Sequence, residues 1–191
     1  MNFLYLGRYR QRFQDIIAVM APEDRRIIEL CFGDIYIAEY CKKSERQWIG
    51  YDINDVFVNY ALEHGHNAVC ADILSLKKLP PADVLIFAGS LYHFNENLHH
   101  IWQLMTSCAT RIILSEPIKN ITSNNNIIGK IGARASAVRN GAETFRFDHD
   151  SLIEMLDSFQ ETYDFTYEIV SEKKDILIII NERHQHRHTG L

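Results

Sequence analysis

Short apolar runs of strand length alternate with helix-like stretches along most of the chain, and this alternation restricts the possible folds more than any other feature. Strands are expected at the apolar runs 26–30, 47–52, 67–71, 84–88 and 111–115. Helices are expected between them at 36–43, 55–64 and 96–106. Strands that alternate with helices form a parallel sheet covered by helices on both faces. Ligands of such sheets bind beyond the carboxyl ends of the strands.

The last third of the chain has a different pattern. A helix is expected at 151–159, and two further strands, 163–170 and 175–182, are joined by the charged turn 171–174. Such a pair forms a hairpin, so the last strand must run antiparallel to its neighbour. The predicted fold class is therefore α/β. It is a doubly wound, mostly parallel seven-stranded sheet with helices on both faces and a C-terminal antiparallel hairpin.

Length and composition exclude several classes of function. The chain has 191 residues and a formal charge of −5, whereas nucleic acids and anionic membranes select basic surfaces, so neither partner is expected. The apolar runs are too short to cross a bilayer and the N-terminus does not read as a signal peptide, which predicts a cytoplasmic protein. Four scattered cysteines favour buried thiols over a metal site. Residues 1–182 are expected to form one domain, and 183–191 a flexible, histidine-containing tail without a metal site.

Acidic residues stand at the ends of the first three predicted strands. The first strand closes with Glu29, the second ends in Asp52, and Asp72 lies just beyond the third. Carboxylates that share one crevice repel each other, so folding alone gives little reason to collect them there. A ligand that carries positive charge and many hydrogen-bond donors gives such a reason. Taken singly, each acid is better explained as a helix N-cap or as a solvated strand end.

Three short segments strengthen the interpretation of these acids. Residues 29–35 read ELCFGDI, residues 90–94 read SLYHF and residues 115–117 read SEP. Together with the three acids and the terminal hairpin, this pattern resembles the class I S-adenosylmethionine-dependent methyltransferases of the small-molecule type, over about residues 24–182. The resemblance implies a Rossmann-like methyltransferase fold, S-adenosylmethionine as cofactor, S-adenosylhomocysteine as product and a small-molecule methyl acceptor.

The resemblance also implies roles for individual residues. Glu29 is expected near the methionine amino group, Asp52 on both ribose hydroxyls, and Asp72 on the adenine amine. The other residues expected to contact the cofactor are Tyr9, Cys31, Gly33, Ile53, Ile73, Ala88 and Gly89. Residues 1–22 are expected to form a helical lid over it.

The turn after the first strand departs from the family pattern. Cys31 and Ile35 occupy positions where the family has glycine, and only Gly33 is retained. An alternative function is therefore a non-catalytic binding or scaffold subunit with a weakened cofactor site. A dinucleotide-dependent dehydrogenase is disfavoured because G-x-G-x-x-G is absent and Glu29 would repel a pyrophosphate.

Residues that follow the fourth strand, and residues of a long connection, are candidates for acceptor binding and catalysis. His93 is the candidate general base because imidazole titrates near neutrality, although a structural role bound to the backbone explains it as well. Tyr92 is expected to shape the acceptor pocket. The connection 119–147 is expected to cap the substrate, with Arg134 and Arg139 binding an anionic acceptor; a solvated helix face is the alternative.

Overall fold

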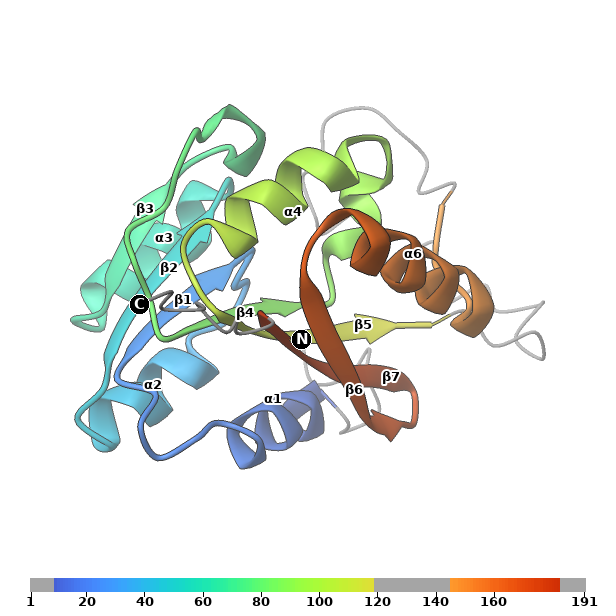
Figure 1. Cartoon of the computed structure of the whole chain (residues 1–191). Helices are drawn as coiled ribbons and strands as arrows, with labels where there is room; N and C mark the ends of the chain where they lie inside the picture. Colours follow the sequence, from blue (N-terminus) through green and yellow to red (C-terminus); the bar gives the residue numbers. More distant parts are fainter. Residues whose placement is uncertain (1–8, 119–144, 183–191) are drawn as a thin grey trace, which may run out of the picture.

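The computed structural model describes residues 9–118 and 145–182 and confirms the predicted seven-stranded sheet (Figure 1). The strands lie in the order β3-β2-β1-β4-β5-β7-β6. Their bounds are β1 Arg26–Leu30, β2 Gln47–Asp52, β3 Asn67–Cys70, β4 Val84–Ala88, β5 Arg111–Pro117, β6 Phe165–Glu172 and β7 Asp175–Glu182. The helices are α1 Tyr9–Ala18, α2 Tyr36–Lys43, α3 Asp55–Glu63, α4 Leu98–Thr106 and α6 His149–Thr162, with the short 3-10 helices η1 Ile73–Ser75 and η2 Leu91–Asn97.

The pairing of the strands follows the predicted pattern, and the chain order reverses near the centre of the sheet. Strands β1 to β5 pair in parallel, while β7 runs antiparallel to both β5 and β6, as the hairpin pattern predicts. The chain order reverses between β1 and β4, which are neighbours in the sheet. Both strands are almost wholly buried, which explains why they read as continuous apolar runs. In open α/β sheets, ligands bind in the crevice at such a reversal, beyond the carboxyl ends of the two strands, which are β1 and β4 in this sheet.

The bounds of several elements differ from those predicted, including β6, which begins at Phe165 and not at residue 163, and three of the differences have a local reason. The helix expected to begin at residue 96 begins at Leu98, because residues 91–97 form the tighter helix η2 with a kink at Phe94. Strand β5 continues to Pro117, beyond the apolar run that predicts it. Helix α6 begins earlier than its apolar residues indicate, since Asp148 and Ser151 form a capping box in which each side chain bonds the other's backbone amide.

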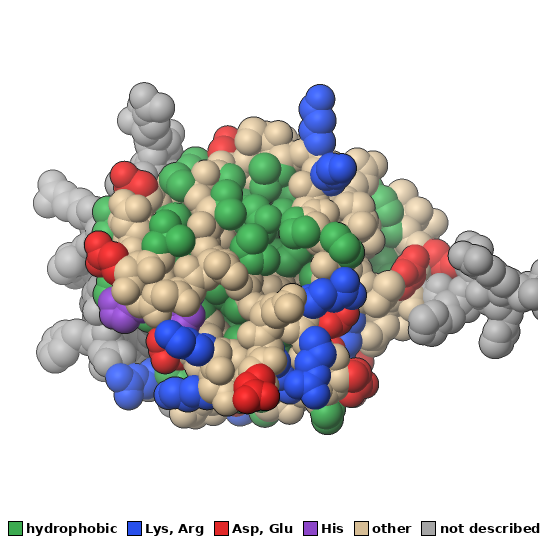
Figure 2. Space-filling model, turned by 90° about the vertical axis from the view of Figure 1, so that its left-hand side faces the viewer, with side chains coloured by type: hydrophobic (Ala, Val, Ile, Leu, Met, Phe, Trp, Pro, Cys, Tyr) green, Lys and Arg blue, Asp and Glu red, His purple; other side chains and the backbone are tan. Residues whose placement is uncertain are grey.

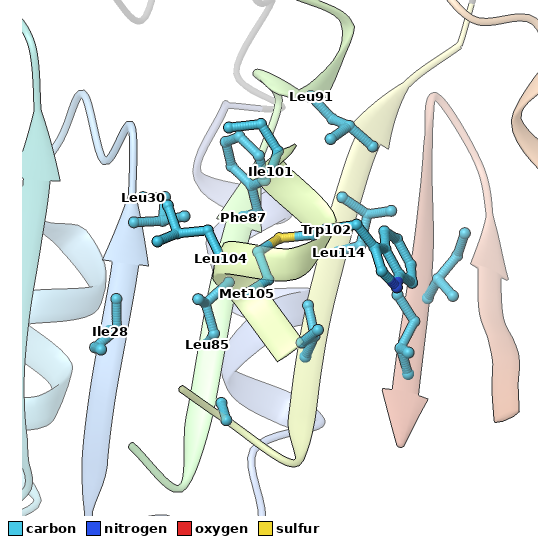
Figure 3. Packing of buried hydrophobic residues seen from close by; sticks show 14 of the residues in the cluster. Ile28, Leu30, Leu85, Phe87, Leu91, Ile101, Trp102, Leu104, Met105 and Leu114 are labelled. Atoms are coloured by element: carbon cyan, nitrogen blue, oxygen red, sulfur yellow. The ribbon is translucent and has the colours of Figure 1, made fainter. Parts of the chain in front are cut away.

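Two apolar clusters hold the helices against opposite faces of the sheet. In Figure 1, α1 and α2 lie below the sheet and α4 and α6 above it. On the lower face, Ile16 of α1 and Val58 of α3 pack in one cluster. On the upper face, Ile101, Trp102 and Met105 of α4 cover β1, β4 and β5 (Figure 3). Each fully buried side chain of this size stabilises the fold by roughly 1.5–3 kcal/mol.

Helix α1 is a fixed part of the lower layer. Its Phe13 and Ile16 are only 3% and 0% exposed, and Phe13 stacks on Tyr36 of α2 at a centroid distance of 5.5 Å. Helix α1 therefore contributes to the core, whereas the role of the segment 1–22 as a cover for the cofactor stays a prediction. Residues 1–8 lie outside the described part of the chain.

The β3 edge of the molecule is partly apolar. Val56 and Tyr60 of α3 and Val69 of β3 are exposed, and Figure 2, which faces this side, shows apolar side chains gathered at its centre. Among the described residues, no helix is long and apolar enough to cross a membrane. The described residues likewise contain no cluster of His, Cys, Asp and Glu suited to a metal ion.

Candidate functional site

Backbone hydrogen bonds align the carboxyl ends of the parallel strands. The Cys31 amide donates to the Tyr51 carbonyl at 2.7 Å, the Ala71 amide to the Asp52 carbonyl at 2.9 Å, and the Gly89 amide to the Ser115 carbonyl at 2.6 Å. These bonds continue the sheet by one residue beyond β1, β3 and β4. The segments that follow these strands therefore begin at the same edge of the sheet, next to one another.

The glycine-poor turn after β1 keeps the backbone path that glycine would favour. Cys31 and Gly33 both have φ of +53°, in the left-handed region that costs an L-residue roughly 1–2 kcal/mol. The cysteine therefore replaces a glycine at a position where the backbone still requires one. Ile35, by contrast, has φ of −89° and is buried in the lower cluster, so the other glycine replacement carries no backbone strain.

Asp52 ties the end of β2 to this turn. Its carboxylate accepts hydrogen bonds from the Gly33 amide at 3.2 Å and from the Asn54 amide at 2.8 Å. Burial raises the pKa of Asp52, and these amide bonds oppose the shift. The next residue, Ile53, is 69% exposed. Each carboxylate oxygen of Asp52 can accept a further hydrogen bond, and the Ile53 side chain beside it is exposed. These two residues therefore suit a ligand with hydroxyl groups and a flat ring.

Asp72 combines a capping role with a place in the same acidic group. Its side chain accepts from the Leu74 amide at 3.0 Å and so caps η1, which is the ordinary role considered for each acid. Burial raises the pKa of the Cys31 thiol, and the nearby carboxylates of Asp52, Asp72 and Glu116 raise it further. Three acids from the ends of β2, β3 and β5 therefore lie near enough to one thiol to disfavour its ionisation.

Glu29 lies deeper than the other acids. It has no exposed surface, and its Oε2 accepts from the Trp48 indole Nε1 at 2.9 Å. Its Oε1 is buried and has no hydrogen-bond partner among the described residues. Burial raises the pKa of Glu29 well above its ordinary value, and Asp34 and Asp52 add to the shift. The structure thus places Glu29 beneath the turn, while its contact with a methionine amino group stays a prediction.

Glu116, within the SEP segment, is a site residue that sequence reasoning did not select. The carboxyl group is wholly buried and accepts from the amides of Leu91 and Tyr92 at 3.1 and 3.2 Å. Burial raises its pKa to about 7, against the effects of the two amides, Arg12 and Arg146. Glu116 therefore fixes the start of η2 to the end of β5. The signal in the sequence was an acid inside an otherwise apolar strand.

Arg12 of α1 is a second residue that the sequence did not reveal as part of the site. Its guanidinium pairs with Asp175 of β7 through two bonds of 2.8 and 3.0 Å. The same group lies over Gly89, because a Cβ at that position would collide with it. Gly89 has φ of +70° and follows half-buried Ala88 at the end of β4. Helix α1 thus brings a cation to the crevice between β1 and β4.

The SLYHF segment forms the other wall of the site. Tyr92 is 8% exposed, and the Arg146 guanidinium lies over its ring at 4.0 Å from the centroid. His93 is exposed and its ring lies 4.0 Å from that of Tyr92. The Arg146 guanidinium and the His93 imidazole therefore both lie against the Tyr92 ring, next to the amides that Glu116 binds.

The remaining predicted site residues fall into two groups. Ile73 is buried with 3% exposure at the start of η1, next to Asp72. Tyr9 opens α1, but its side chain lies outside the described part of the structure, as do Arg134 and Arg139. Among the lysines and arginines that the structure describes, Arg146 is the closest to Arg134 and Arg139 along the sequence.

Comparisons with known proteins support the fold. The sequence matches no protein-family model, and no curated protein matches it at a significant level. Among solved structures, the methyltransferase domain of bacterial CtHen1 superposes with a TM-score of 0.68 at 15% identity, covering 90% of this chain and 98% of that chain. DhpI in complex with SAM and HEP gives a TM-score of 0.67 at 12% identity, covering 92% and 86%.

Further structures agree with these two. Magnesium protoporphyrin IX methyltransferase from Synechocystis PCC 6803 with bound SAH has a TM-score of 0.62 at 14% identity, covering 94% of this chain and 84% of that chain. A SAM-dependent methyltransferase from Archaeoglobus fulgidus gives 0.62 at 16% identity, covering 94% and 99%. Likeness at these identities concerns the fold, so the conclusion concerns the fold as well: this chain has the Rossmann-like fold of the class I S-adenosylmethionine-dependent methyltransferases.

Proposed function

We propose that this protein binds S-adenosylmethionine at the carboxyl edge of its sheet and transfers the methyl group to a small-molecule acceptor. The observation that carries the proposal is that Asp52 bonds the Gly33 amide of the turn after β1 at 3.2 Å, while Asp52, Asp72 and Glu116 all lie near enough to the Cys31 thiol of that turn to raise its pKa. Carboxylates gathered in this way favour a ligand with positive charge and several hydrogen-bond donors. Neighbours in fold are known with SAM or SAH bound.

The described residues fit the adenosyl part of this cofactor. Asp52 uses its carboxylate oxygens for two amide bonds, and each oxygen keeps a further lone pair for a ribose hydroxyl. Ile53 offers an exposed apolar surface directly beside it, suited to one face of adenine. Asp72 is exposed and its carboxylate can accept from an exocyclic amine.

The methionine part fits between β1 and β4. The backbone approaches closely at Gly33 and Gly89, both of which have positive φ. Arg12 lies over Gly89 and supplies a cation for a carboxylate. When bound, S-adenosylmethionine supplies a methyl group on a positively charged sulfur, activated for transfer to a nucleophile.

The chain's own contribution to the reaction is positioning. Glu116 holds the amides of Leu91 and Tyr92, so the wall that faces the acceptor is fixed before the acceptor binds. His93 is the proposed base for an acceptor hydroxyl or ammonium group, since it is exposed on that wall. Arg146, stacked on Tyr92, gives the same wall positive charge and favours an anionic acceptor. Arg134 and Arg139 are proposed to add to that charge.

The non-catalytic alternative rests on one specific observation. Cys31 keeps a left-handed backbone at a cost that glycine would avoid, as expected of a cofactor turn under relaxed selection. A scaffold subunit would retain the fold but bind no S-adenosylhomocysteine.

Isothermal titration calorimetry with S-adenosylhomocysteine separates the two functions. We expect binding in the micromolar range, and a loss of about 10- to 100-fold in Asp52→Asn, since a hydrogen bond to a charged group contributes roughly 1.5–3 kcal/mol. Asp55→Asn is the matched control: Asp55 is an exposed acid three positions further on and makes none of these contacts. Absence of binding at millimolar ligand, or equal affinity in both variants, would refute the proposed site.

A further inference from the structure

A cleft opens at the amino-terminal edge of the sheet, opposite the candidate cofactor site. Its volume is about 490 Å³, within the ~300–1,000 Å³ typical of small-molecule sites. Four segments line it: the start of β1, the end of α2 with the start of β2, the turn between α3 and β3, and residues 80–82 before β4. Figure 2 faces this side of the molecule and shows Lys, Arg and His side chains gathered in its lower part.

The lining of the cleft is basic in a chain that is acidic overall. It includes Arg26, Lys42, Arg46 and His66 and no Asp or Glu, although the chain carries a formal charge of −5. Arg26 is paired with Asp83 at 2.6 Å, and His66 with Glu39 at 2.8 Å. Lys42 donates to the His64 carbonyl at 3.2 Å, and neither Lys42 nor Arg46 forms an ion pair within the described ranges. Both cations can therefore still bond an anion.

Arg46 lacks an acceptor where one is expected. Its Nη1 is buried, and no described residue accepts a hydrogen bond from it. Buried N–H groups in folded proteins are nearly always bonded, and for a guanidinium the missing bond is especially unfavourable. The guanidinium lies 5.5 Å from the centre of the Tyr40 ring, which holds it in place. An oxygen of a bound anion would complete its hydrogen bonding.

The same cleft has an apolar wall. Trp48 lines it together with Pro80 and Pro81. Trp48 is held rigidly, because its indole packs against Phe32 at 5.3 Å between centroids and donates to Glu29 at 2.9 Å. Prolines lose little conformational freedom on binding. The wall therefore suits a flat, apolar group attached to the anion.

We propose that this cleft binds a small phosphate monoester with a flat apolar part. The dianionic phosphate bonds to Lys42 and to the buried Nη1 of Arg46, whose two positive charges it balances. The apolar part lies against Trp48 and the two prolines. This site lies at the opposite edge of the sheet from the proposed cofactor site, and its test does not require that the cofactor binds.

Heteronuclear NMR on the full chain, with naphthyl phosphate as the probe, tests the proposal. We expect saturable shifts of the Trp48 indole N–H and of the Gly65 and Asn67 amides, both of which belong to the lining. Naphthol, which lacks the phosphate, and inorganic phosphate, which lacks the apolar part, should each bind at least about tenfold more weakly.

Matched variants make the test specific. Lys42→Gln and Arg46→Gln should each weaken naphthyl phosphate binding about tenfold or more. Lys43→Gln should leave it unchanged, since Lys43 is also exposed on α2 but does not line the cleft. Titration of each variant with S-adenosylhomocysteine, at the opposite edge, should give the wild-type result and so shows that the fold is intact.

Three results would overturn the proposal. The first is no saturable shift up to about 5 mM naphthyl phosphate. The second is equal binding of naphthol or of inorganic phosphate, which would remove the role of the charge or of the apolar wall. The third is an equal effect of Lys42→Gln and Lys43→Gln with Arg46→Gln unchanged. Each result would stand whether or not S-adenosylhomocysteine binds.

Discussion

The two edges of the sheet differ in charge although the same strands build both. At the carboxyl edge, Asp52, Asp72 and Glu116 lie near enough to the Cys31 thiol to raise its pKa. At the amino edge, Lys42 and Arg46 line a cleft that contains no acid. Strand geometry does not require this difference, because both edges consist of loops that can carry any residue. The polarity therefore points to ligands of opposite charge: a sulfonium-bearing nucleoside at one edge and an anion at the other.

One side chain connects the two edges. Trp48 lines the amino-edge cleft, donates to Glu29 beneath the cofactor turn and packs against Phe32 within that turn. Gly50 leaves room for this packing, since a Cβ there would collide with both aromatic rings. The carboxyl edge also carries the left-handed Cys31 and the wholly buried acids Glu29 and Glu116.

The largest expected effect concerns the buried acid of the carboxyl edge. The pKa of Glu116 is raised from 4.5 to about 7, so the folded protein holds more protons than the unfolded chain between these pH values. Its free energy of unfolding should then fall as the pH rises through this window, by about 3 kcal/mol from this group alone. Glu116→Gln cannot ionise and should lose that part of the pH dependence. Urea unfolding at pH 4.5, 6 and 7.5 measures it; parallel curves for the two proteins would contradict the assignment.

A second test compares one glycine from each edge. Gly89 and Gly65 have φ of +70° and +75°, so alanine at either position should destabilise the fold by about 1–2 kcal/mol. Only alanine at 89 collides with Arg12. We therefore expect Gly89→Ala to weaken S-adenosylhomocysteine binding about tenfold and Gly65→Ala to leave it unchanged. If calorimetry gives equal affinities for the two variants, Arg12 does not belong to the cofactor site.

The smallest expected effect concerns the cofactor turn itself. Cys31→Ala keeps a Cβ at φ of +53°, whereas Cys31→Gly removes it. The glycine variant should be the more stable of the two by about 1 kcal/mol, because the strain of the left-handed conformation exceeds the entropic cost of glycine. Thermal unfolding of both variants provides the measurement. A more stable alanine variant would mean that the turn carries no strain.

Much of the fold could be predicted because local pattern and tertiary structure agree. Strands β1, β2 and β4 have the predicted bounds, since they are buried on both faces or bounded by clear breakers. The end of β5 and the start of α4 were predicted less well. Glu116 interrupts the apolar run of β5, and η2 depends on the amides that Glu116 binds across 24 and 25 positions of the sequence.

The site could be predicted only in part, for a related reason. Acids at strand ends are visible in the sequence, because each follows an apolar run. Arg12 is not visible in this way, because its position is fixed by the ion pair with Asp175, which is 163 positions away in the sequence. The amino-edge cleft is also hidden from the sequence, since Arg26, Lys42 and Pro80 come from segments that only the folded sheet brings together.

The most direct test of the account is to map S-adenosylhomocysteine onto the backbone amides by NMR. The account predicts saturable shifts at Gly33, Ile53 and Gly89 of the carboxyl edge, with Gly65 and Asn67 of the amino edge unaffected. Shifts confined to the amino edge, or no shifts at millimolar ligand, would contradict the assignment of the cofactor to the acidic edge.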